Sequence, residues 1–294
     1  HFEYLKSILE KQNIEFNENK LKTLNIINLE NKYTNLGLLL SDECPFSIKA
    51  SIFSGKDKLE FSDRKEFNGS ILKQAEEIFD YLNLFNKVKG EIIDLLRVDT
   101  YDYPKYALRE AILNAIIHRD YNFNGSILVS LFIDRIEVSS LGGLLKGLTI
   151  EDIYNGISET RNPKLANVFY RLKYVESFGT GIDRIMSSYV DNDKQPVISI
   201  SDNVFKITLY NRNYTDYSFI LNEDTQFNPF GTSKENLIIY YLKHHKTISR
   251  LDAERVLGLS KTRTSEILKN MVNDGILTIN GNGKTTNYSL KNRD

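Results

Sequence analysis

The strongest constraint on this chain is the pattern of its C-terminal segment, Thr232 to Asn292. Apolar residues recur there at helical spacing in three successive stretches. Ser249 and Ser260 precede the second and third stretches, and serine is a preferred residue for capping a helix N-terminus. The segment therefore predicts three short helices, Lys234–His244, Ser249–Leu257 and Ser260–Asn273.

A hairpin signal follows the third helix. The run Asn280-Gly281-Asn282-Gly283 predicts a tight turn between strands over Ile276–Ile279 and Thr285–Leu290. Helix, helix, turn, helix and hairpin in this order are typical of a winged helix. That module lays its third helix in the major groove of DNA and its wing along the backbone. The alternative is a winged helix that contacts protein.

The distribution of charge favours DNA as the partner of this segment. From Thr232 onward 11 Lys and Arg stand against 6 Asp and Glu, a net charge of +5 in a chain whose total is −1. The run LSKTRTSEILKNMVNDGIL also resembles the winged-helix domains of bacterial transcription regulators. Seven side chains on the third helix and the wing are of types that reach base edges and phosphates of double-stranded DNA: Ser260, Lys261, Thr262, Arg263, Ser265, Lys269 and Lys284.

Composition limits the class of protein. The chain has 294 residues, 41% hydrophobic and 26% charged, which is ordinary for a globular protein with more than one domain. No stretch reaches the roughly 20 apolar residues of a membrane span, so no membrane partner is expected. A single cysteine, Cys44, excludes an internal disulfide and suits a reducing cytoplasm. His1 in place of Met indicates a trimmed chain with something missing upstream.

A second signal lies in the middle of the chain. Pro104 suits the first turn of a helix that we expect to run to about Arg119. Glu110, Asn114 and His118 are spaced by four and so share one face of it. Glutamate can orient or deprotonate a water, and an asparagine oxygen can bind Mg²⁺. Spacing alone favours a solvated helix face over such a site.

The segments after this helix favour the site over a solvated helix face. A hairpin over Ser126–Ile133 and Arg135–Ser140 ends at Gly142-Gly143, and a glycine turn at Gly179-Thr180-Gly181 opens another helix. This order resembles the GHKL-type ATP-binding fold, a Bergerat-type α/β sandwich. More closely, four runs resemble the divergent GHKL-like module of bacterial proteins described as RecG-like helicase-related or as transcriptional regulators: REAILNAIIHRDY, IEVSSLGGL, RNPKLANVFYRL and VESFGTGIDRI.

The resemblance implies roles for single residues. Glu110 would activate water as the catalytic residue, Asn114 would hold Mg²⁺, and ATP would be the cofactor. Ser140, Gly142 and Gly143 would line the base pocket, Gly179 and Gly181 would form the phosphate turn, and His118 either caps its helix or closes the pocket. GHKL enzymes carry an aspartate where this chain has Ser140, which weakens selectivity for adenine. The chain also lacks a G-x-x-x-x-G-K-[ST] phosphate loop, so a P-loop helicase motor is not expected.

These signals predict an α+β protein in four parts. Residues 1–98 form an α+β region packed on the central module, 99–215 form the GHKL-like module, 216–231 a linker and 232–294 the winged helix. Proteins that the chain resembles commonly carry an AlbA-like (Schlafen-type) domain upstream, and we expect that the sequence starts after such a domain.

Three functions remain open. The first is a DNA-binding transcriptional regulator whose central module senses a nucleotide ligand; a two-fold operator would then require a homodimer. The second is an ATP-dependent enzyme of DNA transactions or phage defence, with at least weak ATPase activity. The third is a non-catalytic dimerising scaffold with a DNA-binding domain.

Overall fold

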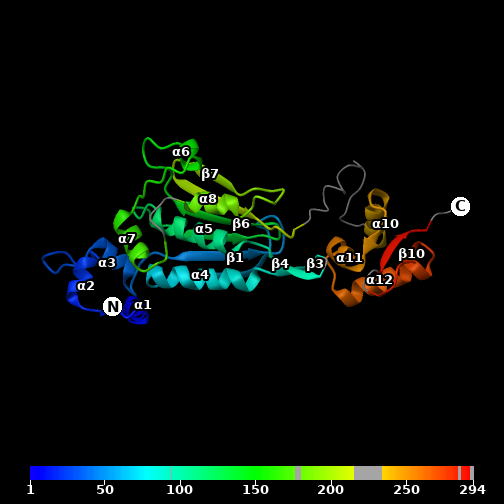
Figure 1. Cartoon of the computed structure of the whole chain (residues 1–294), viewed down its shortest axis with the longest axis horizontal. Helices are drawn as coiled ribbons and strands as arrows, with labels where there is room; N and C mark the ends of the chain where they lie inside the picture. The colour runs from blue at the N-terminus through cyan, green and yellow to red at the C-terminus, as the bar shows by residue number, and fades with distance from the viewer. Residues whose placement is uncertain (94, 176–179, 215–233, 284–285, 292–294) are drawn as a thin grey trace. The chain divides into compact units, whose positions relative to one another are not determined.

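The chain divides into two units, His1–Tyr214 and Thr215–Asp294, each with its own hydrophobic core. The computed structural model describes residues 1–93, 95–175, 180–214, 234–283 and 286–291 (Figure 1). The linker predicted over 216–231 lies outside the described residues. Each unit is therefore described by itself.

A six-stranded mixed sheet organises the first unit, in the order β2-β1-β5-β6-β8-β7. β1 and β5 run parallel, and every other neighbouring pair in this sheet is antiparallel. A mixed sheet combined with helices agrees with the α+β class expected from the sequence. The strands are β1 Ile48–Phe53, β2 Phe61–Phe67, β5 Ile127–Leu131, β6 Arg135–Leu141, β7 Val197–Ser201 and β8 Val204–Tyr210.

Two long helices cover this sheet (Figure 1). α4 (Ile71–Phe85) packs on β1 and β2, and α5 (Lys105–Ile117) packs on β6 and β8. Burial alternates along β6, as expected for a strand with one covered face. None of the described helices is long and apolar enough to cross a membrane. The shorter helices are α1 Glu3–Lys11, α2 Glu18–Thr23, α3 Asn35–Leu40, α6 Ile150–Tyr154, α7 Pro163–Arg171 and α8 Gly181–Ser187.

The sequence over Glu91–Val98 predicts a single strand before α5, and the structure differs from this prediction. This region forms an antiparallel hairpin of β3 (Val88–Ile93) and β4 (Leu96–Tyr101), which belongs to neither of the other sheets. The apolar residues run almost continuously through the turn, and no Asn-Gly or Pro-Gly pair marks it. The turn therefore leaves no local signal in the sequence.

The described part of the second unit, residues 234–283 and 286–291, contains three helices and a small sheet. The helices are α10 Lys234–His244, α11 Arg250–Leu257 and α12 Lys261–Asn273. Strands β10 (Leu277–Asn280) and β11 (Asn287–Leu290) form a hairpin, and β9 (Ile248–Ser249) adds to β11 to give the order β10-β11-β9. The three helices and the hairpin lie where the sequence predicted them, and β9 is additional.

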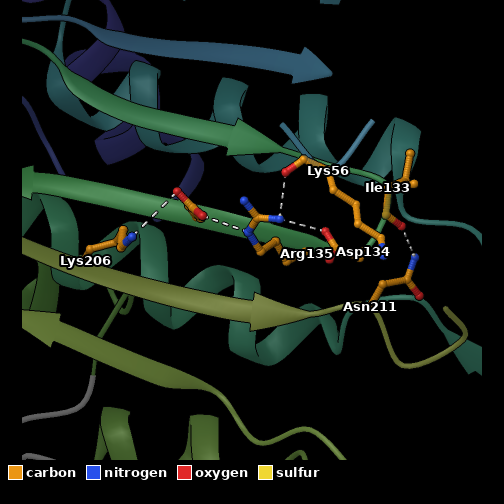
Figure 2. A network of polar contacts seen from close by, with 7 residues as sticks. Lys56, Ile133, Asp134, Arg135, Lys206 and Asn211 are labelled. Carbon is orange, nitrogen blue, oxygen red and sulfur yellow. Dashed lines mark hydrogen bonds and ion pairs between the residues drawn. The ribbon is translucent and has the colours of Figure 1, made fainter. Parts of the chain in front are cut away.

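A network of hydrogen bonds and ion pairs around Arg135 stabilises the β5–β6 turn of the first unit (Figure 2). The Arg135 guanidinium contacts the Asp134 carboxylate at 2.9 Å, the Glu137 carboxylate at 2.7 Å and the Lys56 carbonyl at 3.1 Å. Lys206 on β8 adds a 3.8 Å contact to Glu137. The guanidinium also lies over the Phe132 ring, 3.9 Å from its centre. The side chains of Asp134, Glu137 and Arg135 are only 12%, 14% and 21% exposed, so solvent screens this network less than a surface ion pair.

Arg135→Met is expected to lower the free energy of unfolding of the first unit by about 2 kcal/mol, because two half-buried carboxylates lose a charged hydrogen-bond donor. Lys32→Met is the matched control. It removes a lysine whose ion pair with Glu30 is 75% and 70% exposed, and it should cost under about 0.5 kcal/mol. Urea unfolding followed by circular dichroism measures both. Equal losses in the two variants would contradict the stabilising role of the network.

Candidate nucleotide-binding site

A cavity of about 490 Å³ opens in the first unit between α5, the end of β6, α7 and α8. Its lining includes seven of the eight residues that the sequence analysis assigned to a nucleotide site: Glu110, Asn114, His118, Ser140, Gly142, Gly143 and Gly181. Gly179, the eighth, lies outside the described residues. The structure thus brings together residues that are up to 71 positions apart in the chain.

Helix α5 forms one wall of the cavity. Most of its side chains are fully buried apolar residues, among them Leu108, Ile112 and Ile116. Glu110 is itself only 9% exposed. The expectation from spacing alone, a solvated polar face, is therefore wrong: the polar stripe of α5 faces a cavity.

The N-terminus of α8 lies against Glu110 and Asn114. A Cβ atom on Gly181 would stand 2.8 Å from Glu110 Oε2 and 3.3 Å from Asn114 Nδ2. A side chain at this position would therefore displace the Glu110 carboxylate, and glycine leaves it room. Arg109 binds the other carboxylate oxygen of Glu110, with Nη1 2.6 Å from Oε1. The Glu110 carboxylate thus lies between the Arg109 guanidinium and the N-terminus of α8.

The Asn114 side chain uses its amide nitrogen within α5. Its Nδ2 donates to the Glu110 carbonyl at 2.9 Å, and no hydrogen bond to Oδ1 is recorded from the part of the chain that the structure describes. Among those same residues no three His, Cys, Asp or Glu side chains come together as a metal site. Mg²⁺ commonly binds one or two protein oxygens together with substrate phosphates and water, so these residues fit a cation delivered with a nucleotide.

Two further polar residues line the cavity, Ser140 on β6 and His118 directly after the end of α5. Ser140 donates its hydroxyl hydrogen to the Ala115 carbonyl at 2.7 Å, so the side chain fastens β6 to α5 and only its oxygen lone pairs remain for a ligand. Burial, and then the positive charge of Arg161, lowers the pKa of His118 from 6.5 to about 4. The imidazole is therefore neutral at pH 7 and offers one donor and one acceptor.

Gly142 and Gly143 also have a packing role. Gly142 has φ +106°, and a Cβ on Gly143 would stand 2.4 Å from the Ser201 carbonyl. Their backbone N–H groups donate to the carbonyls of Asn203 and Asp202 in the β7–β8 turn, at 2.8 and 3.2 Å. The two glycines therefore let this turn close directly on the end of β6.

The sequence analysis did not assign Arg161 to the site. Its Nη2 donates to the Gly143 carbonyl at 3.0 Å and its Nη1 stands 3.4 Å from the Asp120 carboxylate. Asn167, Tyr170 and Arg184 also line the cavity. Arg161, Asn167 and Tyr170 all lie in the run RNPKLANVFYRL, which resembles the GHKL-like module but to whose single residues no role was assigned, so the signal for them was the motif.

In the second unit five of the seven residues assigned to DNA lie on α12. Lys261, Thr262, Arg263 and Lys269 are exposed and Ser265 is half-buried, whereas the opposite side of α12 buries Thr264, Leu268 and Met271. Ser260 is exposed at the N-cap position, but its side chain makes no capping hydrogen bond, contrary to the expectation. Lys284 lies outside the described residues.

Comparison with known proteins finds a matching family model and similar solved structures. Residues 124–209 match the model of a family described as "Putative ATP-dependent DNA helicase recG C-terminal". The crystal structure of the DIP2311 protein from Corynebacterium diphtheriae is similar to the chain with a TM-score of 0.63 and 22% sequence identity, over 97% of this chain and 59% of that one. No curated protein matches the chain.

The structural similarity shows the fold alone, and the chain spans less than two thirds of the DIP2311 chain. The family match covers β5 to β8 and includes Ser140, Gly142, Gly143 and Gly181, but it begins after α5. The segment 124–209 is therefore related to the RecG C-terminal family and is ATPase-like.

Proposed function

We propose that the protein is a DNA-binding transcriptional regulator whose first unit binds a magnesium nucleotide, with ATP as the leading candidate. The central observation is the cavity, whose lining includes Glu110, Asn114 and Gly181 together with His118 and Ser140. Its volume of about 490 Å³ is within the range of sites for small molecules and cofactors. The GHKL-like sandwich and the winged helix are parts of this proposal.

Different residues of the cavity lining suit different parts of a nucleotide. The Asn114 oxygen would ligate Mg²⁺, which screens the charge of the phosphates, and the nearby Glu110 carboxylate would orient a water. About one turn beyond Asn114, the neutral His118 at the end of α5 and the Ser140 oxygen on β6 offer uncharged hydrogen-bonding groups to a base. Apolar side chains such as Leu145 and Ile153 line the remaining wall and suit the flat faces of a base.

The second unit supports DNA as the partner. α12 exposes Lys261, Thr262 and Arg263 in its first turn, which carries no acidic residue. The other side of α12 packs on α11, so the basic side points away from the unit's own core. A helix with this exposed surface, followed by the β10–β11 hairpin, has the features of a recognition helix and wing.

Magnesium-ATP at about 100 times its dissociation constant is expected to raise the melting temperature of the first unit by roughly 5 to 10 °C, because a ligand that binds only the folded state stabilises it. Asn114→Ala should abolish the shift. Asn83→Ala is the matched control, since Asn83 on α4 also donates its Nδ2 to the carbonyl four residues earlier, at 2.8 Å, but lies outside the cavity. Differential scanning calorimetry measures all three proteins. Loss of the shift in both variants, or no shift with any nucleotide, contradicts the assignment.

Arg263→Ala is expected to weaken binding to double-stranded DNA about tenfold and to reduce the salt dependence of binding by about one counterion, as for a lost phosphate contact. Lys246→Ala is the matched control, because Lys246 is an exposed cation of the same unit outside α12. Fluorescence anisotropy over a range of salt concentrations gives both quantities. Equal losses in the two variants would indicate diffuse attraction to a basic surface instead of a recognition helix.

ATP hydrolysis is the second candidate function, and the placement of Glu110 beside Asn114 favours it. Glu110→Gln separates it from simple binding, because the amide keeps the size of the side chain but cannot accept a proton from water. A variant that retains the ATP-dependent shift in melting temperature and loses phosphate release would assign Glu110 as the general base. Absence of phosphate release from the unmodified protein, with binding intact, would leave the nucleotide as a regulatory ligand.

A further inference from the structure

The β3–β4 hairpin is an arm with a rigid base and an exposed end. At the base, Asn86 donates Nδ2 to the Tyr103 carbonyl and accepts from the Tyr103 N–H, both at 2.9 Å. Asn213, at the end of the unit, donates to the Thr100 carbonyl at 3.0 Å. Beyond this base, β3 and β4 pair with each other and with no third strand from the part of the chain that the structure describes.

The outer part of the arm exposes apolar side chains. Leu95 is 98% exposed and Leu96 73%, and Val98 in the middle of β4 is 43% exposed. A two-stranded hairpin is marginally stable in water, and open edges are commonly protected by charges, proline or a covering element. Here β4 keeps both an open backbone edge and apolar side chains, which together are features of a surface that another strand covers.

The charges on β4 indicate which strand would cover this edge. Arg97 and Asp99 flank Val98, and their side chains form a 2.7 Å ion pair on the face of the hairpin above Gly90. If two β4 strands pair antiparallel about a two-fold axis at Val98, Arg97 lies opposite Asp99 of the partner subunit, and the reverse pair follows by symmetry. The same register places the two Val98 side chains opposite each other, a favourable cross-strand pair. The edge is therefore complementary to itself.

We infer that β4 is a dimerisation edge, which pairs with β4 of a second copy of this chain to form a four-stranded sheet, β3-β4-β4-β3. In this sheet each hairpin gains a third strand from the other copy, and Leu96 lies opposite the partner's Thr100. The charges of Arg97 and Asp99 in the two copies alternate along the contact between the β4 strands. This contact does not depend on the nucleotide or the DNA proposal. It lies within the first unit and needs neither ligand.

Symmetric cross-linking of the full chain tests the register. Val98→Cys, made together with Cys44→Ala so that it is the single cysteine, is expected to form a disulfide-linked dimer on mild oxidation, because paired Cβ atoms approach to about 5 Å. Lys89→Cys in the same background is the control. Lys89 lies on β3. In such a sheet the two β3 strands are three strand spacings, or roughly 14 Å, apart. A dimer that Val98→Cys does not cross-link overturns the inference, as does equal cross-linking of both cysteines.

Charge exchange tests the complementarity by sedimentation equilibrium. Arg97→Asp sets like charges opposite each other at two symmetric positions, and it should weaken the dimer about tenfold. The double change Arg97→Asp with Asp99→Arg restores opposite charges and should recover most of that loss. Both residues are well exposed, at 70% and 48%, so the melting temperature of each variant should stay near that of the unmodified protein. A protein that is monomeric up to submillimolar concentration, or a double change that stays as weak as the single one, overturns the inference.

Discussion

The burial of helix α5 is the constraint on which the first unit depends. Apolar side chains occupy most of its circumference, so the unit cannot form without enclosing the helix between the sheet and its neighbours. Glu110, a carboxylate that is 9% exposed, is then held in a largely apolar setting, and it is stable there because Arg109 pairs with it. Gly181 lets α8 approach this pair closely. The cavity is thus a consequence of how α5 is covered, and Glu110 and Asn114 are part of its lining.

This constraint explains how much of the site the sequence could predict. A spacing of four places Glu110, Asn114 and His118 on one side of any helix, so their grouping follows from local geometry. Whether that side faces water or a cavity depends on contacts with α7 and α8, which are distant in the chain and leave no local pattern. Arg161 shows the same limit, because its partners Gly143 and Asp120 are 18 and 41 residues away. The β3–β4 turn could not be predicted because the residues on both sides of it resemble a single strand, with apolar residues almost continuous through the turn.

The contacts of Ser140 and Arg161 bear on which nucleotide the cavity would select. Ser140 uses its hydrogen on the Ala115 carbonyl, and the Asp120 carboxylate is engaged by Arg161 and by the Asn122 amide. The Ser140 oxygen and one His118 nitrogen would therefore offer only neutral acceptors to a base with an exocyclic amine. Neutral acceptors form weaker hydrogen bonds than a carboxylate. Recognition of the base would then depend more on shape and apolar contact, and most of the affinity would come from the phosphates and Mg²⁺ near Glu110 and Asn114.

The position of the hairpin in the chain connects the proposed dimer with this cavity. β4 ends at Tyr101, and α5, which carries Glu110 and Asn114, begins at Lys105. The residues between them are fixed by the Asn86–Tyr103 pair and by the hydrogen bond from the Asp102 N–H to the Lys87 carbonyl, at 2.8 Å. A partner strand on β4 would therefore act on a segment joined stiffly to the N-terminus of the helix that lines the site. By linkage, any effect of dimerisation on ligand affinity must be matched by an equal effect of the ligand on dimerisation. A regulator that reads a two-fold operator needs such a coupling, because the state of its ligand must reach the contact that sets the spacing of its two DNA-binding units.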